Sequence, residues 1–157
     1  MDDTAPVAQD EQDERDEHFM RQAIALARRA LASGDTPVGS LVVRAGNVLA
    51  EGVEAVRAGL DITAHAEIIA VREACRAAGG FDLSACTLYT TAEPCWMCSF
   101  AIRQARIGRV VIGRPTPGIG GGGPPHALLL EPAVPGWGPP PALVRGVLGG
   151  ECALLRR

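Results

Sequence analysis

Lysine is absent from this chain of 157 residues, so all 15 of its Lys and Arg positions are arginines. They stand against 18 acidic residues, and the formal net charge is −3 at pH 7. A protein that binds nucleic acid mainly through phosphate contacts normally carries a basic patch. The terminal pair Arg156 and Arg157 is too small to form one. The composition therefore disfavours a nucleic-acid partner, although a local site stays possible.

Long apolar runs are missing as well. No run approaches the roughly 20 apolar residues that a membrane-spanning helix needs. The acidic start, Met1-Asp2-Asp3-Thr4, lacks the basic and then apolar stretch of a secretory signal. We therefore expect a cytoplasmic protein without a membrane partner. Apolar residues make up 47% of the chain and charged residues 21%, which suits the core of one domain and excludes a disordered chain.

Cysteines are few and odd in number, which argues against a disulfide scaffold. Such scaffolds are usually smaller, denser in cysteine and even in cysteine count, whereas this chain has five. Cys95 and Cys98 form a close pair, which in a cytosolic chain is typical of a metal or redox site. Cys75, Cys86 and Cys152 have no such spacing, and we expect them to be small buried core residues.

Hydrophobic periodicity outlines one α/β domain. Residues 1–14 are rich in Asp, Glu and Gln and are expected to form an acidic disordered tail, which leaves 15–157 as the single domain. Strands alternating with helices after an initial hairpin predict a layered α/β fold with a mixed sheet. The expected helices are 15–33, 64–78, 95–105 and 142–155, and the expected strands are 38–44, 48–53, 87–91 and 109–113. Residues 114–142 are dominated by Gly and Pro and should lack regular structure.

The residues that carry chemistry stand at the starts of two predicted helices. His65 opens the helix 64–78, and Cys95 and Cys98 open the next one, so the three side chains can meet at one end of the sheet. Zinc takes thiolate and imidazole ligands tetrahedrally, and a catalytic zinc keeps its fourth position for water. A helix N-terminus also lowers the pKa of a thiol, which favours the ligating thiolate. We predict one Zn²⁺ per subunit, bound by His65, Cys95 and Cys98.

Glu67, two residues after His65, is the predicted catalytic group. Zinc lowers the pKa of bound water from roughly 15.7 to about 7. Removal of an aromatic amine also needs a general acid/base that carries protons to the ring nitrogen and to the departing ammonia. The pattern H-x-E…P-C-x-x-C is a known signature of zinc base deaminases. Either half alone is ambiguous, because a cysteine pair can be a structural zinc knuckle or a redox pair and a lone His is more often packed. Together they predict a zinc-dependent aminohydrolase.

Residues 16–113 resemble the cytidine-deaminase-like superfamily, in the branch of bacterial tRNA adenosine deaminase, guanine deaminase and yeast-type cytosine deaminase. The matching segments are 19–27, Thr36-Pro37-Val38-Gly39, 63–68, Leu88-Tyr89-Thr90 and Glu93-Pro94-Cys95. The resemblance implies a three-layer α/β/α sandwich with a mixed five-stranded sheet, and usually a homodimer. It also implies that Ala66 contacts the substrate through its backbone and that Glu67 is the proton shuttle.

Glu54 departs from the family pattern. Relatives typically place a substrate-binding Asn eleven residues before the His ligand, and here that position holds Glu54. An Asn amide both donates and accepts hydrogen bonds, whereas an ionised carboxylate only accepts. We expect Glu54 to bind a ring N–H or amino group, which favours donor-rich rings such as guanine, pterin, triazine or another aminopyrimidine. The alternative is that Glu54 points into solvent.

The C-terminal third departs too. The tRNA enzymes carry basic residues in their last helix, but here a glycine run, 118–123, and several prolines take that region, which argues against a large anionic substrate. The run formally fits a dinucleotide-binding fingerprint, yet prolines follow where a helix should open. The segment 114–142 is a possible active-site lid. Its Trp137 could stack on a small substrate ring, an interaction that contributes roughly 1–3 kcal/mol, or it could simply hold the loop against the domain. Trp96, between the cysteines, either lines the pocket or packs beneath the zinc.

We predict a hydrolase of nucleoside or nucleobase metabolism that removes the exocyclic amine of a small heterocycle, as a free base or nucleoside, and releases ammonia. The alternative enzyme is a tRNA-specific adenosine deaminase (A to I), favoured by residues 106–111 and by the first predicted helix. A non-catalytic zinc-binding interaction domain is the alternative from another class, but it would have little reason to keep Glu67. A thiol–disulfide oxidoreductase using Cys95 and Cys98 is a distant further alternative.

Overall fold

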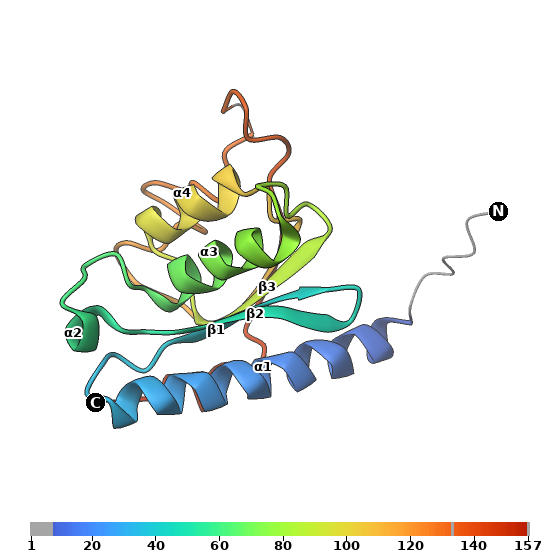
Figure 1. Ribbon diagram of the computed structural model, residues 1–157. Coiled ribbons are helices and arrows are strands. Elements are labelled where there is room, and N and C mark those ends of the chain that lie inside the picture. The colour runs from blue at the N-terminus through green and yellow to red at the C-terminus, as the bar shows by residue number, and fades with distance from the viewer. Residues whose placement is uncertain (1–7, 133, 157) are drawn as a thin grey trace.

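The computed structural model describes residues 8–132 and 134–156. Its sheet has the strand order β2-β1-β3-β4-β5, with β1 antiparallel to β2 and β3, and with β3, β4 and β5 parallel; Figure 1 labels β1, β2 and β3. The helices are α1 Gln9–Ala32, α2 Val56–Gly59, α3 Ala66–Ala78, α4 Trp96–Gln104 and α5 Gly149–Ala153. The strands are β1 Gly39–Arg44, β2 Asn47–Val53, β3 Cys86–Ala92, β4 Arg109–Arg114 and β5 Ala142–Arg145. None of the described helices is both long enough and apolar enough to cross a membrane.

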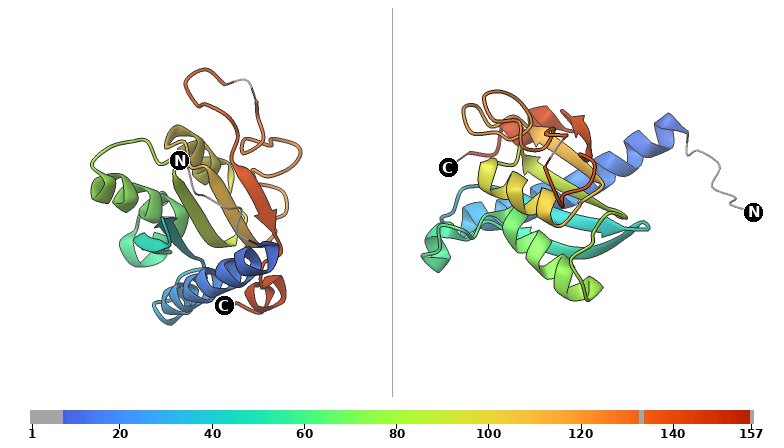
Figure 2. Two further views of the ribbon diagram at one scale, coloured as in Figure 1. Left: turned by 90° about the vertical axis from the view of Figure 1, so that its right-hand side faces the viewer. Right: turned by 90° about the horizontal axis from the view of Figure 1, so that it is seen from above.

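Helices cover both faces of this sheet. α1 and α5 lie on one face, and α3 and α4 lie side by side on the other (Figures 1 and 2). Side chains alternate accordingly, because successive residues of a strand point to opposite faces. In β3, Leu88 joins the core beneath α3 and α4, and Tyr89 joins the core beneath α1. The three-layer α/β/α sandwich with a mixed five-stranded sheet is confirmed.

The first helix begins earlier than the sequence predicted. α1 starts at Gln9, so residues 9–14, which were expected in a disordered tail, are helical. Asp10 and Glu11 lie in its first turn, where the helix dipole favours negative charge. Asp16, two turns further on, is buried against the sheet and anchors this end of the helix. The rest of the expected tail, residues 1–7, lies outside the described residues.

The C-terminal helix expected over 142–155 is wrong in its first half. Residues 142–145 form β5, parallel to β4, and a helix follows only at 149–153. Leu143 packs against the core on the α3 and α4 face, and Val144 packs against the opposite core, which is the alternation of a strand. Gly146 follows β5 with a φ of 77°. The short α2 was also not expected. The described residues between β4 and β5 contain no helix or strand, as predicted.

Candidate metal centre

The metal centre forms where α3 and α4 begin, next to the end of β3. His65 immediately precedes α3, Cys95 immediately precedes α4, and Cys98 lies in the first turn of α4. Gly52 of β2 allows α3 to come this close to the sheet. A Cβ at Gly52 would lie well within 3.0 Å of the Ala66 carbonyl oxygen, a separation that real side chains do not show.

The structure brings the three predicted ligands together. His65 Nδ1 lies 3.5 Å from Cys95 Sγ and 3.4 Å from Cys98 Sγ. In a tetrahedral site with Zn–S near 2.3 Å and Zn–N near 2.05 Å, a nitrogen and a sulfur ligand are about 3.6 Å apart. The spacing and the donor set therefore fit zinc. Hydrogen bonds from Cys98 and His65 lower the pKa of Cys95 to about 4, so its sulfur is a thiolate, the form that binds metal.

Glu67 is buried in the first turn of α3, beside these ligands. Its Oε2 lies 3.6 Å from Cys98 Sγ, and its Oε1 accepts a hydrogen bond from Thr90 Oγ1 at 3.2 Å. Burial raises the pKa of Glu67 to about 7. A carboxyl group with a pKa near neutral can both take and give a proton at working pH. The arrangement thus sets a proton carrier next to a metal ligand.

Sequence reasoning missed the polar pair that supports Glu67. Ser40 Oγ lies 2.9 Å from Thr90 Oγ1, and both residues are completely buried. The two residues are direct partners across the β1–β3 ladder, on the side of the sheet that reaches Glu67. The signal that could have found them is a hydroxyl side chain in each of the two strands predicted for the middle of the sheet.

Glu54 follows directly after β2 and is buried, so the solvent-pointing alternative is wrong. Its Oε1 accepts a hydrogen bond from the Ala66 backbone N–H at 2.8 Å. One of its carboxylate oxygens also lies within 4.8 Å of ligand atoms of both His65 and Glu67. Burial raises the pKa of Glu54. Glu54 and Ala66, which were each expected to contact the substrate, are therefore hydrogen-bonded to each other.

Trp137 lies elsewhere. Its Nε1 donates a hydrogen bond of 2.7 Å to Oε1 of Gln104, the last residue of α4, at the opposite end of that helix from Cys95. Its ring packs edge-on against Phe100 and faces the Arg103 guanidinium. Trp137 therefore pins its loop to α4 and does not cover the metal centre of its own chain, which corrects the interpretation of this residue as a lid.

Trp96 follows Cys95 at the start of α4 and is half-buried. Its ring lies edge-on to His126, with the ring centroids 4.8 Å apart, so it packs against the Gly/Pro-rich segment 114–142. The Trp96 Nε1 is buried without a hydrogen-bond partner among the described residues. The neighbourhood of His126 was not anticipated, because 30 residues separate it from Trp96.

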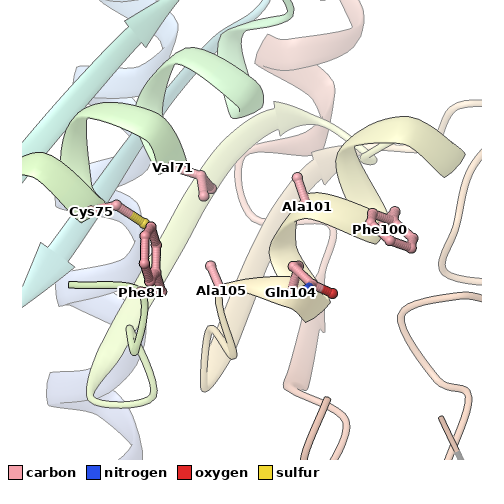
Figure 3. A pocket seen from close by; sticks show the side chains of 7 residues that line it. All are labelled: Val71, Cys75, Phe81, Phe100, Ala101, Gln104 and Ala105. Atoms are coloured by element: carbon pink, nitrogen blue, oxygen red, sulfur yellow. The ribbon is translucent and has the colours of Figure 1, made fainter. Parts of the chain in front are cut away.

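An apolar groove of about 560 Å³ lies between α3 and α4, and Figure 3 shows the side chains that line it. Phe81 and Phe100 stand at its sides and are 84% and 54% exposed. No predicted metal ligand, nor Glu54 or Glu67, lines this groove. It is therefore separate from the site that carries the chemistry.

Comparison with known proteins identifies the family. The model of the cytidine and deoxycytidylate deaminase zinc-binding region matches residues 13–114. The chain is 38% identical to the chloroplastic tRNA(adenine(34)) deaminase of Arabidopsis thaliana over 88% of its own length, but spans only 12% of that protein. It is 43% identical to the guanine deaminase of Bacillus subtilis over 57% of its length and 58% of that enzyme. A solved structure from a study of A-to-I editing by tRNA:A34 deaminases superposes with a TM-score of 0.80 at 35% identity, covering 88% of this chain and 99% of the other. The chain belongs to the zinc-binding cytidine and deoxycytidylate deaminase family.

Proposed function

We propose that this protein is a hydrolytic deaminase of a nucleobase amine. The observation that carries the proposal is the set of three ligand atoms at zinc spacing with the buried Glu67 carboxyl group 3.6 Å from Cys98 Sγ. When bound, zinc supplies a nucleophilic water at neutral pH. Glu67 passes one proton from the attacking water to the ring nitrogen and a second to the departing amine. A C–O bond forms, the C–N bond breaks, and ammonia leaves.

Adenosine in a tRNA is the substrate that the relatives favour. Both the Arabidopsis protein and the solved structure are named for deamination of tRNA adenine 34. The test is conversion of adenosine to inosine at the wobble position of an anticodon stem-loop. We expect inosine with the wild-type protein and none with Glu67→Gln, because Gln cannot carry protons. An RNA that stays unchanged under saturating zinc would contradict the tRNA proposal.

A free donor-rich base is the second candidate, and Glu54 favours it. Apart from its amine, the adenine of a nucleoside or an RNA offers only acceptor ring nitrogens, which an acceptor-only carboxylate binds poorly. Guanine carries a ring N–H, and one of the relatives is a guanine deaminase. Ammonia release should be measured for guanine, adenine, cytosine, a pterin and an aminotriazine, beside the stem-loop. A non-catalytic zinc domain would release no ammonia from any of them.

Replacement of Glu54 separates these candidates. If Glu54 binds a ring N–H, Glu54→Asn should lower kcat/KM for guanine at least tenfold relative to adenosine, about 1.4 kcal/mol. Glu51→Gln replaces an exposed carboxylate in β2, just before Glu54, and as the matched control should change neither value. Equal effects of Glu54→Asn on guanine and adenosine would mean that Glu54 hydrogen-bonds to Ala66 without contacting the substrate.

We further propose that the protein is a homodimer in which a second copy covers the apolar groove beside Phe81 and Phe100. Large apolar side chains on a contiguous surface favour a protein partner. Light scattering after gel filtration should give the dimer mass, and Phe100→Glu should give the monomer mass. Leu154→Glu changes an exposed apolar residue elsewhere and should leave the dimer intact.

We also propose a cytoplasmic location. All five cysteines are free of disulfide bonds, which fits a reducing compartment such as the cytoplasm.

A further inference from the structure

Cys95 belongs to neither β3 nor α4. It ends the connection 93–95 between them, and its carbonyl oxygen accepts a hydrogen bond from the Ser99 N–H of α4 at 2.8 Å. The glycine run 118–123 adds contacts from outside the helix. The Gly121 N–H donates to the Pro94 carbonyl oxygen at 2.8 Å, and Gly120 pairs with Cys95 in an isolated antiparallel bridge. Ser99 Oγ donates to the same Pro94 oxygen at 3.2 Å.

Two glycines of this run lie too close to their neighbours to carry a side chain. A Cβ at Gly120 would lie 2.8 Å from the Thr116 carbonyl oxygen and would clash with the Glu93 carboxylate, and a Cβ at Gly121 would lie 2.6 Å from the Ser99 Cβ. A Cβ at Gly122 would meet only the end of the flexible Arg145 side chain. The run 120–122 therefore serves close backbone packing against the connection 93–95, which accounts for a motif that only formally fitted a dinucleotide fingerprint.

The Glu93 carboxylate joins the parts of this assembly. It is buried, and its Oε2 accepts a hydrogen bond from the Gly122 N–H at 3.0 Å. Its Oε1 lies 3.7 Å from Arg145 Nη1, at the end of β5, and 3.5 Å from the Thr116 N–H. The Glu93 carbonyl oxygen accepts from Thr116 Oγ1 at 2.8 Å. One residue thus links the connection 93–95, the glycine run and β5.

We propose that Glu93 is a positioning residue for the metal centre. Through the run 120–122, it holds Cys95 at the distance from His65 that zinc requires, and so it sets zinc affinity without touching the metal. The inference rests on the proposed zinc site. Loss of such supporting contacts leaves a ligand to be ordered on binding, and typically weakens metal affinity 10–100-fold.

The test measures zinc affinity by competition with a chromophoric chelator. Glu93→Ala should bind zinc 10–100-fold more weakly than the wild type. Glu93→Gln keeps an oxygen that can accept from Gly122 and should recover most of the affinity. Gly120→Ala perturbs the same contact without changing charge and should weaken binding like Glu93→Ala. Glu14→Ala, an exposed residue of α1, is the control and should bind like the wild type.

Cobalt provides a second readout, because absorption of bound Co²⁺ reports thiolate ligation. We expect weaker or shifted thiolate-to-cobalt absorption in Glu93→Ala and Gly120→Ala. Wild-type zinc affinity and cobalt spectra in both variants would overturn the proposal, even if their melting temperatures fell. If the Glu93→Ala variant does not fold, the zinc affinity of the Gly120→Ala variant tests the proposal.

A wild-type protein that binds zinc but deaminates nothing would refute the proposed function alone. A wild-type protein that binds no zinc would refute both the proposed function and the positioning role of Glu93.

Discussion

Asp16 joins α1 to the sheet, and we predict that Asp16→Asn strongly destabilises the protein. The Asp16 side chain is 3% exposed and accepts two hydrogen bonds from Arg109, at 2.7 and 2.5 Å. The Tyr89 hydroxyl donates a third at 2.9 Å. Arg109 begins β4 and Tyr89 lies in β3, so one carboxylate ties the helix to two central strands.

The size of the effect follows from burial. Breaking a fully buried ion pair costs about 3–5 kcal/mol, whereas a fully exposed pair contributes about 0–1 kcal/mol. Arg109 is 24% exposed, so it regains some hydration when its partner is lost, and Asn still offers one acceptor. We expect a loss of about 2–3 kcal/mol. In a domain of this size, that lowers Tm by roughly 4–12 °C.

Urea unfolding at pH 7 with saturating zinc measures the loss. Glu17→Gln is the matched control, since Glu17 is the next residue, is 48% exposed, and pairs only with the exposed Arg21 among the described residues. It should change the free energy of unfolding by less than about 0.5 kcal/mol. A loss below about 1 kcal/mol for Asp16→Asn would show that the burial cost of Asp16 cancels its pairing.

The same pair predicts a pH dependence. Burial acts to raise the pKa of Asp16, but hydrogen bonds from Arg109 and Tyr89 outweigh it and hold the pKa below its ordinary 3.8. A carboxylate with a lowered folded-state pKa contributes stability above its unfolded value and loses it as pH falls through the folded value. The stability difference between wild type and Asp16→Asn should therefore be constant from pH 7 to about 5 and shrink below about 4. A difference that persisted at pH 2 would refute this reasoning.

Three further predictions concern the site. Glu67→Gln should lower kcat for ammonia release about 10²–10⁴-fold without lowering Tm, because Gln still accepts from Thr90; more than a tenth of wild-type activity would contradict its role. A chelator should remove one zinc per chain and all activity, and added zinc should restore both; activity that survives chelation would exclude a metal-dependent reaction. Gly52→Ala should cost about 1–3 kcal/mol and weaken zinc binding by displacing Ala66, whereas Gly59→Ala, whose Cβ would meet nothing closer than 4.0 Å, should do neither.

The metal centre could be predicted because its residues stand at local landmarks. His65 and Cys95 each precede a helix with a clear apolar period, and the start of a helix fixes where its first side chains lie. The hairpin of β1 and β2 could also be predicted, because its two strands are neighbours in the sequence. β5 was not predictable in this way, because a segment of four residues fits the apolar period of a helix as well as that of a strand. Its pairing with β4 also joins segments that lie more than 30 residues apart in the sequence. Polar residues 9–14 carry no apolar period, so a solvated helix looks like a tail.

Side-chain partners were the least predictable features. Trp137 had a plausible stacking role from its Gly/Pro surroundings, but its hydrogen-bond partner is Gln104, 33 residues earlier. Glu54 and Ala66 were each expected to face the substrate. Their mutual hydrogen bond depends on how closely α3 packs on β2, which Gly52 decides through the space it leaves. Such choices are made by tertiary packing, after the local elements are set.

The charge of the metal centre restricts which substrates it can bind. Two thiolates balance the charge of a zinc ion, so Glu54 and Glu67 decide the remaining charge around the substrate. Burial raises the pKa of both carboxyl groups, and a third acid or an anionic substrate group would raise these values further. The metal centre therefore suits a neutral or cationic ring better than an anionic one. If the substrate base belongs to an RNA, the phosphates should lie away from these two carboxyl groups, and because the chain has no lysine, arginine is the cationic side chain available to bind them.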